Sequence, residues 1–359
     1  MKDISRKGSV VIFLVPVILL LIVASVFFFK DTLFPQKTQE FSKPIIIGFS
    51  LGTLQEERWQ KDRDQFLKEI KTMDNVSLLV EASNNNSETQ ISQIESMISK
   101  GVDVLIVVPY DATALSDVIA KAHQSGIKVL SYDRLILDSS VDVYLSFDNE
   151  KVGELEAKGV IDALKQKLSD NNKLKIAYVG GSTTDNNAKL LREGSYKILQ
   201  PLIDSGKIEI VMDEFTPNWD PDNAYKNFKK YLVSSGGQID GVIAANDGTA
   251  GGVIKALSEY KLDGIVPVSG QDAELAALQR IAQGTQTITV YKPIPNLVAS
   301  GIDIAVKLAN GETVKTNATV NDGKVDIPSV LLDPIAVTKE NIEDTVVKDG
   351  YHTSSEIYK

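Results

Sequence analysis

The chain has 359 residues, with 43% hydrophobic and 24% charged side chains and a formal net charge of -10. This length allows two domains with separate cores, and the composition is that of a folded protein. The negative charge argues against a nucleic-acid partner, because a nucleic-acid surface needs dense basic residues. There is no cysteine, and only His123 and His352. These counts exclude disulfides, thiolate catalysis, a lipid-modified N-terminal cysteine and a Cys- or His-rich metal site.

The first informative segment is the uncharged run at residues 8–29, between Lys7 and Lys30. At about 1.5 Å per residue, a helix of this length spans a hydrocarbon core of roughly 30 Å. The residues before the run are basic, so the positive-inside rule predicts an extracytoplasmic location for the rest of the chain. A cleaved signal peptide is the alternative, but the run ends in the phenylalanines at 27–29 rather than in small residues. We therefore expect a single-pass protein of the cell membrane, with an anchor at 8–29 and a polar tether at 30–43.

From residue 44 onward, short β-branched runs alternate with longer helical patterns. The predicted strands lie at 44–50, 76–83, 102–109, 127–133 and 141–148, and, after residue 172, at 174–182, 208–215, 239–246 and 264–272. The helical patterns lie at 66–73, 88–101, 112–126, 150–168, 186–206, 223–235, 248–260 and 274–284. Apolar strands that alternate with helices predict parallel sheets covered on both faces. The sequence therefore predicts an α/β protein with two doubly wound halves.

Two segments, 102–133 and 239–272, share a layout of apolar strand, polar cap, small-residue helix, glycine and second strand. Each segment ends in an aspartate, so Asp133 and Asp272 occupy equivalent strand ends. In open α/β sheets, ligands bind beyond the carboxyl ends of the strands. We therefore expect the binding site between the two halves.

Polar side chains gather at these strand ends in both halves. They are Asp133, Arg134, Asp185, Asn187, Asn246, Asp272 and Lys292, and the two tryptophans, Trp59 and Trp219, fall one in each half. Carboxylates, amides and cations suit the hydroxyls of a sugar, and aromatic rings suit its apolar face. Simpler alternatives exist, because Asp and Asn at strand ends are commonly helix N-caps, Arg134 could pair with Asp138, and Lys292 could be a surface lysine.

The stretch 55–64, "QEERWQKDRD", has the charge pattern of a solvated helix, with i,i+4 pairs at Glu57–Lys61 and Arg58–Asp62. We interpret Glu57 and Asp62 as helix-surface residues. Arg58, Trp59 and Lys61 follow the first strand directly, where the cleft is expected to open. This one stretch then combines a helix surface with part of a binding site.

The chain from about Ile45 to the C-terminus resembles the bacterial D-xylose-binding proteins of the periplasmic sugar-binding superfamily. The resemblance rests on stretches such as "ERWQKDRD", "GIKVLSYDR", "IDGVIAANDGTAGG" and "VSGQDAELAALQRIAQGTQTITVYKPI". It implies a type I periplasmic binding protein fold, in which two doubly wound parallel-sheet lobes are joined by a three-segment hinge. It also implies sugar contacts from Arg58, Lys61, Asp133, Arg134, Asp185, Asn187, Asn246, Asp272 and Lys292, with Trp59 and Trp219 stacking on the sugar.

The resemblance further implies how the lobes divide the chain. The N-terminal lobe is expected to comprise 44–148 and 290–318, and the C-terminal lobe 149–289 and 319–340, followed by a tail at 341–359. Closure of the lobes on the sugar would present it, or the closed form, to a membrane partner. That partner is either the permease of an ABC sugar importer or a two-component sensor histidine kinase.

No catalytic residue, cofactor or metal is expected. A phosphate-binding G-x-x-x-x-G-K-[ST] loop and a G-x-G-x-x-G fingerprint are both missing from the sequence. An enzyme on the same fold, or a binding protein for another monosaccharide, is the alternative function.

Overall fold

A seven-stranded sheet forms the first half of the structure, a computed structural model that describes residues 43–169 and 173–359. Its strand order is β10 (Ala318–Asn321), β11 (Asp326–Leu332), β5 (Val143–Phe147), β4 (Lys128–Tyr132), β3 (Val104–Val108), β1 (Ile45–Leu51) and β2 (Val76–Ala82). All neighbouring strands are parallel except β10 and β11. The predicted parallel sheet of the first half is therefore present, with one antiparallel strand at its edge.

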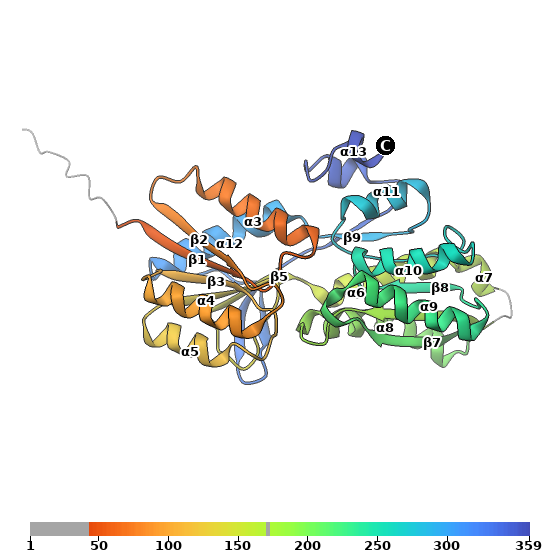
Figure 1. Ribbon diagram of the computed structural model, residues 1–359, viewed down its shortest axis with the longest axis horizontal. Coiled ribbons are helices and arrows are strands. Elements are labelled where there is room, and N and C mark those ends of the chain that lie inside the picture. Colours follow the sequence, from red (N-terminus) through yellow and green to blue (C-terminus); the bar gives the residue numbers. More distant parts are fainter. Residues whose placement is uncertain (1–42, 170–172) are drawn as a thin grey trace, which may run out of the picture. The chain divides into compact units, whose positions relative to one another are not determined.

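Helices cover both faces of this sheet. The helices α3 (Glu57–Ile70) and α12 (Ile294–Ala309) lie on one face, and α4 (Ser87–Ser99) and α5 (Ser116–Gln124) lie on the other (Figure 1). Successive strand residues point to opposite faces. Ile106 therefore packs in the core under α3 and α12, while its neighbours Leu105 and Val107 pack in the core under α4 and α5. This double burial explains the continuous apolar runs of the strands.

The second half contains a smaller parallel sheet in the order β7 (Ile208–Phe215), β6 (Leu174–Gly180) and β8 (Gly241–Ala244). The helices of this half are α6 (Asn149–Ala163), α7 (Lys165–Ser169), α8 (Asn186–Asp204), α9 (Pro221–Ser235) and α10 (Asp247–Glu259), with a short 3-10 turn, η1 (Pro217–Trp219). The predicted strand at 264–272 forms only isolated bridges, at Val268 and Gln271. Helices α6 and α8 cross closely, since a Cβ on Gly153 would lie 1.9 Å from the carbonyl oxygen of Leu191.

The chain passes between the two halves three times. The passages are β5 to α6, β9 (Thr289–Tyr291) to α12, and β11 to β12 (Ile335–Val337). Strands β9 and β12 pair with each other in a separate antiparallel sheet.

The assignment of 319–340 to the C-terminal lobe is wrong for β10 and β11. Strand β11 hydrogen-bonds in parallel to β5 at the edge of the first sheet, and β10 pairs with β11. The open edge of β5 carries backbone N–H and C=O groups that require partners, and β11 supplies them.

The last part of the chain packs against the rest. It contains a π-helical turn, η2 (Glu343–Val347), and a short helix, α13 (Ser354–Ile357), which packs on α11 (Leu275–Gln283) (Figure 1). Ile342, Val346 and Ile357 are buried in the same core as α3 and α12. The segment 341–359, expected as a tail, is thus part of the folded core.

The expected membrane anchor at 8–29 and the tether up to residue 42 lie outside the described residues. Within 43–169 and 173–359, the structure has no helix that is both long enough and apolar enough to cross a membrane.

Candidate functional site

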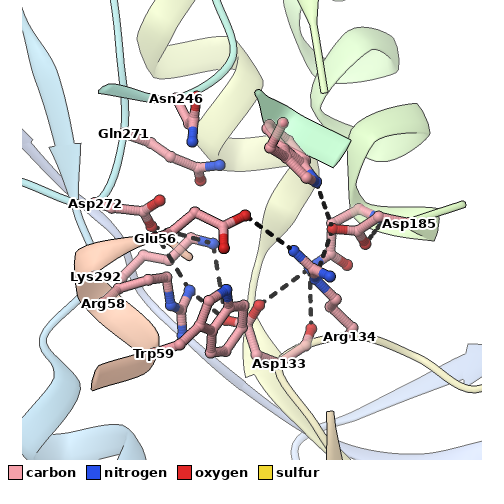
Figure 2. A pocket seen from close by; sticks show the side chains of 12 residues that line it. Glu56, Arg58, Trp59, Asp133, Arg134, Asp185, Asn246, Gln271, Asp272 and Lys292 are labelled. Atoms are coloured by element: carbon pink, nitrogen blue, oxygen red, sulfur yellow. Dashed lines mark hydrogen bonds and ion pairs between the residues drawn. The ribbon is translucent and has the colours of Figure 1, made fainter. Parts of the chain in front are cut away.

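A pocket lies at the strand ends of both sheets, beyond β1, β4, β6 and β8 (Figure 2). Its lining residues are Glu56, Arg58, Trp59, Asp133, Arg134, Asp185, Asn187, Trp219, Asn246, Gln271, Asp272 and Lys292. Charged, amide and indole side chains from both halves line it, and such a set suits a small polar ligand.

Two cations and two carboxylates form the centre of the pocket. Arg58 donates from Nη1 to Asp133 Oδ2 at 2.8 Å, and the same nitrogen lies 3.6 Å from Asp272 Oδ1. The ammonium of Lys292 lies 3.8 Å from Asp133 and 4.0 Å from Asp272. Burial opposes the charged form of Asp133, but the charges of Arg58, Lys292 and Arg134 outweigh it and hold its pKa below the ordinary value. Asp133 is therefore ionised at neutral pH.

A second ion pair forms the opposite side of the pocket. Arg134 Nε lies 2.8 Å from Asp185 Oδ2, and the same carboxylate oxygen accepts a hydrogen bond from Trp219 Nε1 at 3.2 Å. Burial raises the pKa of Asp185, and the charge of Arg134 opposes that rise. Arg134 thus pairs across the two halves with Asp185, and not with Asp138 as the simpler alternative had it.

The amide side chains of Asn187 and Asn246 line the pocket and also make hydrogen bonds that hold its structure. Asn187 donates from Nδ2 to the carbonyl and to the carboxylate of Asp133, at 3.1 and 3.2 Å. Asn246 accepts from the backbone N–H of Thr249 and caps α10, and it also lines the pocket. Asp185 likewise caps α8 by accepting from the backbone of Asn187. Capping and pocket lining are therefore compatible at these two positions.

The two tryptophans line the pocket from different halves of the chain. The guanidinium carbon of Arg58 lies 4.0 Å from the centre of the Trp59 ring, and that of Arg134 lies 5.1 Å from it. The Trp219 ring packs on Gly181, where a Cβ would lie 2.0 Å from the ring. Gly181 is therefore required for the position of Trp219. Both rings are buried, with 2% and 5% of their surface exposed.

Several polar atoms of the pocket have no hydrogen-bond partner among the described residues. They are Glu56 Oε2, Arg58 Nε and Nη2, Trp59 Nε1, Gln271 Oε1 and Asp272 Oδ1, all of them buried. Buried polar groups are normally paired, and each exception requires an explanation. Donors and acceptors are both present in this set, so its natural partner is a ligand with groups that both accept and donate.

Of the residues that the sequence predicted for the site, Lys61 alone lies outside the pocket lining. Its ammonium donates to the backbone carbonyl of Tyr351 at 2.8 Å and lies 3.5 Å from Glu57. The structure also revises the interpretation of Asp62 as a surface residue. Asp62 is fully buried and accepts a hydrogen bond from the Tyr132 hydroxyl at 2.6 Å. Burial raises the pKa of Asp62 to about 6.

Two pocket residues, Glu56 and Gln271, were missed by the sequence reasoning. Glu56 belongs to the charged stretch 55–64 and directly precedes α3, and Gln271 belongs to the predicted strand 264–272, beside Asp272. Glu56 has the sequence character of an ordinary helix-start residue. Gln271 could have been found, because it belongs to the same strand end as Asp272.

Comparison with known proteins identifies the family. A family model described as "Periplasmic binding protein domain" matches residues 47–313. The chain is 50% identical over 316 residues to the D-xylose-binding periplasmic protein of Escherichia coli (strain K12), covering 88% of this chain and 93% of the relative. It is 48% identical over 317 residues to the D-xylose-binding periplasmic protein of Haemophilus influenzae, with the same two shares covered.

A solved structure gives the same result. The carbohydrate transporter solute binding protein from Chloroflexus aurantiacus, in complex with D-glucose, superposes with a TM-score of 0.80 at 29% identity, covering 88% of this chain and 98% of that one. The chain belongs to the periplasmic binding protein family and has its type I α/β fold. It is a binding protein and not an enzyme.

The expected location, as a single-pass protein of the cell membrane, is wrong. The two relatives are named as periplasmic proteins.

Proposed function

We propose that this chain binds D-xylose outside the cytoplasm and closes its two lobes around one sugar molecule. One observation carries the proposal: buried donors and acceptors without a hydrogen-bond partner among the described residues gather in one pocket, which two tryptophans line. The two relatives of about half identity, both named D-xylose-binding, support the choice of sugar. The residues proposed as sugar contacts are Arg58, Asp133, Arg134, Asp185, Asn187, Asn246, Asp272 and Lys292, with Trp59 and Trp219 packing on the ring.

The chemistry of a pentose fits this set of residues. Each hydroxyl both donates and accepts, so one sugar can satisfy Asp272 Oδ1 as an acceptor and Arg58 Nη2 as a donor. Hydrogen bonds to charged groups are the strong ones and set the orientation of the ring. The apolar C–H faces of the ring pack on the indoles.

Contacts between the two halves support closure. The pairs Arg134–Asp185 and Asn187–Asp133 each join residues from different halves, and the Tyr110 hydroxyl donates to Asn218 Oδ1 at 2.9 Å. A ligand that touches both halves stabilises the closed form by its higher affinity for that form.

Calorimetric titration of the purified chain tests the proposal. We expect saturable one-to-one binding of D-xylose, with D-ribose and D-glucose binding more weakly. Small-angle scattering is expected to show a smaller radius of gyration with D-xylose than without it. The absence of any heat of binding at millimolar D-xylose would refute the proposed function.

For the partner, we propose the permease of an ABC importer, in line with the transporter component from Chloroflexus aurantiacus that this chain resembles. Capture from membranes with the D-xylose-loaded chain is expected to recover permease subunits. Capture of a sensor histidine kinase in their place would overturn this assignment in favour of signalling.

A further inference from the structure

Glu56 lies in the pocket, directly before α3. It occupies the position before α3, with φ -76° and ψ 142°, yet its side chain makes no capping hydrogen bond. Only 9% of that side chain is exposed. Figure 2 shows the carboxylate in the middle of the pocket, between Asp272 and Arg134.

The two carboxylate oxygens of Glu56 differ in their surroundings. Oε1 lies 3.7 Å from Arg134 Nη2, which is an ion pair without a hydrogen bond. Oε2 is buried and has no hydrogen-bond partner among the described residues. Burial raises the pKa of Glu56, and the charge of Arg134 opposes this rise. A carboxyl group that is buried, aimed into the pocket and unpaired on one oxygen is positioned to pair with a ligand.

We propose that Glu56 is a further specificity-determining residue, whose Oε2 pairs with one particular hydroxyl of the bound sugar. The inference rests on the proposed function, since it concerns the same pocket and the same class of ligand. A sugar without that hydroxyl would leave Oε2 of Glu56 buried and without a hydrogen bond, and should bind about 10- to 100-fold more weakly. Sites built to hydrogen-bond a hydroxyl reject the analogue that lacks it more strongly than apolar sites reject a change of size.

A purely positioning role is the competing explanation. Glu56 could act only by orienting Arg134, which in turn pairs with Asp185. In that case removal of the Glu56 carboxyl would weaken every sugar by a similar factor, because no single hydroxyl would depend on it. A direct contact instead makes the loss depend on one position of the sugar.

The test measures the affinities of four chains for D-xylose and for its monodeoxy analogues at each hydroxyl. The chains are the unsubstituted protein, Glu56→Leu, Glu56→Gln and the control Glu57→Gln, whose carboxylate faces the backbone of Leu275 and lies outside the pocket lining. We expect Glu56→Leu to weaken D-xylose about 10- to 100-fold and Glu56→Gln to weaken it less. Glu57→Gln is expected to leave the affinity unchanged.

The analogue that lacks the hydroxyl paired with Glu56 should bind equally to the unsubstituted chain and to Glu56→Leu. The other analogues should bind more weakly to Glu56→Leu. A loss of the same factor for every analogue would overturn the direct contact in favour of positioning. Unchanged affinity of Glu56→Leu for D-xylose would also overturn it, while the proposed function would stand. No binding of D-xylose by the unsubstituted chain would overturn the proposed function and this inference together.

Discussion

Asp133 and Asp272 occupy equivalent positions in the two halves, yet the structure holds them differently. Both are buried and both have left-handed backbone, with φ 60° and 92°. Asp133 accepts hydrogen bonds from Arg58 at 2.8 Å and from Asn187 at 3.2 Å. Asp272 Oδ1 lies 3.6 Å from Arg58 and has no hydrogen bond among the described residues. The comparison indicates that Asp133 is part of the scaffold of the pocket besides lining it, whereas Oδ1 of Asp272 is left for a ligand.

The left-handed backbone that Asp133 and Asp272 share supports a functional role for both residues. Non-glycine residues rarely adopt positive φ, and the strain persists only where the surrounding structure enforces it. Asp is among the residues that tolerate this region best. In each case the conformation turns the carboxylate towards Arg58 and Lys292.

The largest expected effect is that of Asp133→Ala on stability. This change leaves the buried Arg58 with Asp62 and Asp272, each at 3.6 Å, and leaves Lys292 with Asp272 at 4.0 Å; breaking a buried ion pair costs about 3–5 kcal/mol. Urea unfolding is expected to show a loss of this size in the free energy of unfolding.

The matched control is Asp303→Ala, since Asp303 pairs with Lys307 at 2.7 Å on the surface of α12. Exposed pairs contribute about 0–1 kcal/mol. Equal losses for the two variants would mean that Asp133 is not part of the scaffold.

The next effect is that of Asp272→Ala on affinity. A hydrogen bond to a charged group contributes about 1.5–3 kcal/mol, so D-xylose affinity should fall about 10- to 100-fold by calorimetry. The free energy of unfolding should fall much less than for Asp133→Ala, because Oδ1 of Asp272 gives up no hydrogen bond to the protein. Asp272→Asn, which tolerates the left-handed backbone, should fall between the unsubstituted chain and Asp272→Ala. A stability loss as large as that of Asp133→Ala would remove the distinction between the two aspartates.

The pH dependence of stability gives a third comparison. Burial would raise the pKa of Asp133, but the charges of Arg58, Lys292 and Arg134 outweigh it and hold the pKa below 3.8. A carboxyl group with a lowered folded-state pKa stabilises the protein above its unfolded-state pKa, and this contribution disappears as the pH falls through the folded-state value. The difference in unfolding free energy between the unsubstituted chain and Asp133→Asn should therefore be constant near neutral pH and shrink below about pH 4. Urea unfolding from pH 7 to pH 3 measures it, and a decrease already between pH 7 and pH 5 would contradict the lowered pKa.

The sequence predicted the fold and the place of the site through its periodicity and its repeat. Alternating strands and helices predicted the two parallel sheets, and the shared layout of 102–133 and 239–272 predicted the matched aspartates. The prediction failed for β11, because the apolar run of a strand does not tell which sheet edge it completes. It could not distinguish Asp133 from Asp272, because the hydrogen bond that holds Asp133 comes from Asn187, in another element of the chain.

The smallest expected effect concerns Lys61, the cation that the resemblance adds to Arg58 and Lys292. Helix α3 buries Arg58, Asp62, Phe66 and Ile70, which recur every four residues, and Lys61 lies beside this stripe with 29% of its side chain exposed.

Lys61→Ala should therefore change D-xylose affinity less than about fivefold, because partly exposed pairs such as Lys61–Glu57 contribute at most about 1 kcal/mol. Lys292→Ala, which removes a buried cation beside both aspartates, should cost about 10- to 100-fold in the same titration. Equal losses for the two lysines would place Lys61 in the ligand-bound pocket, as the resemblance implies, and would require α3 to rotate towards the sugar. A small loss for Lys61 alone would instead mean that Arg58 and Lys292 are the cations that serve the two aspartates in the ligand-bound pocket, as they do in this structure.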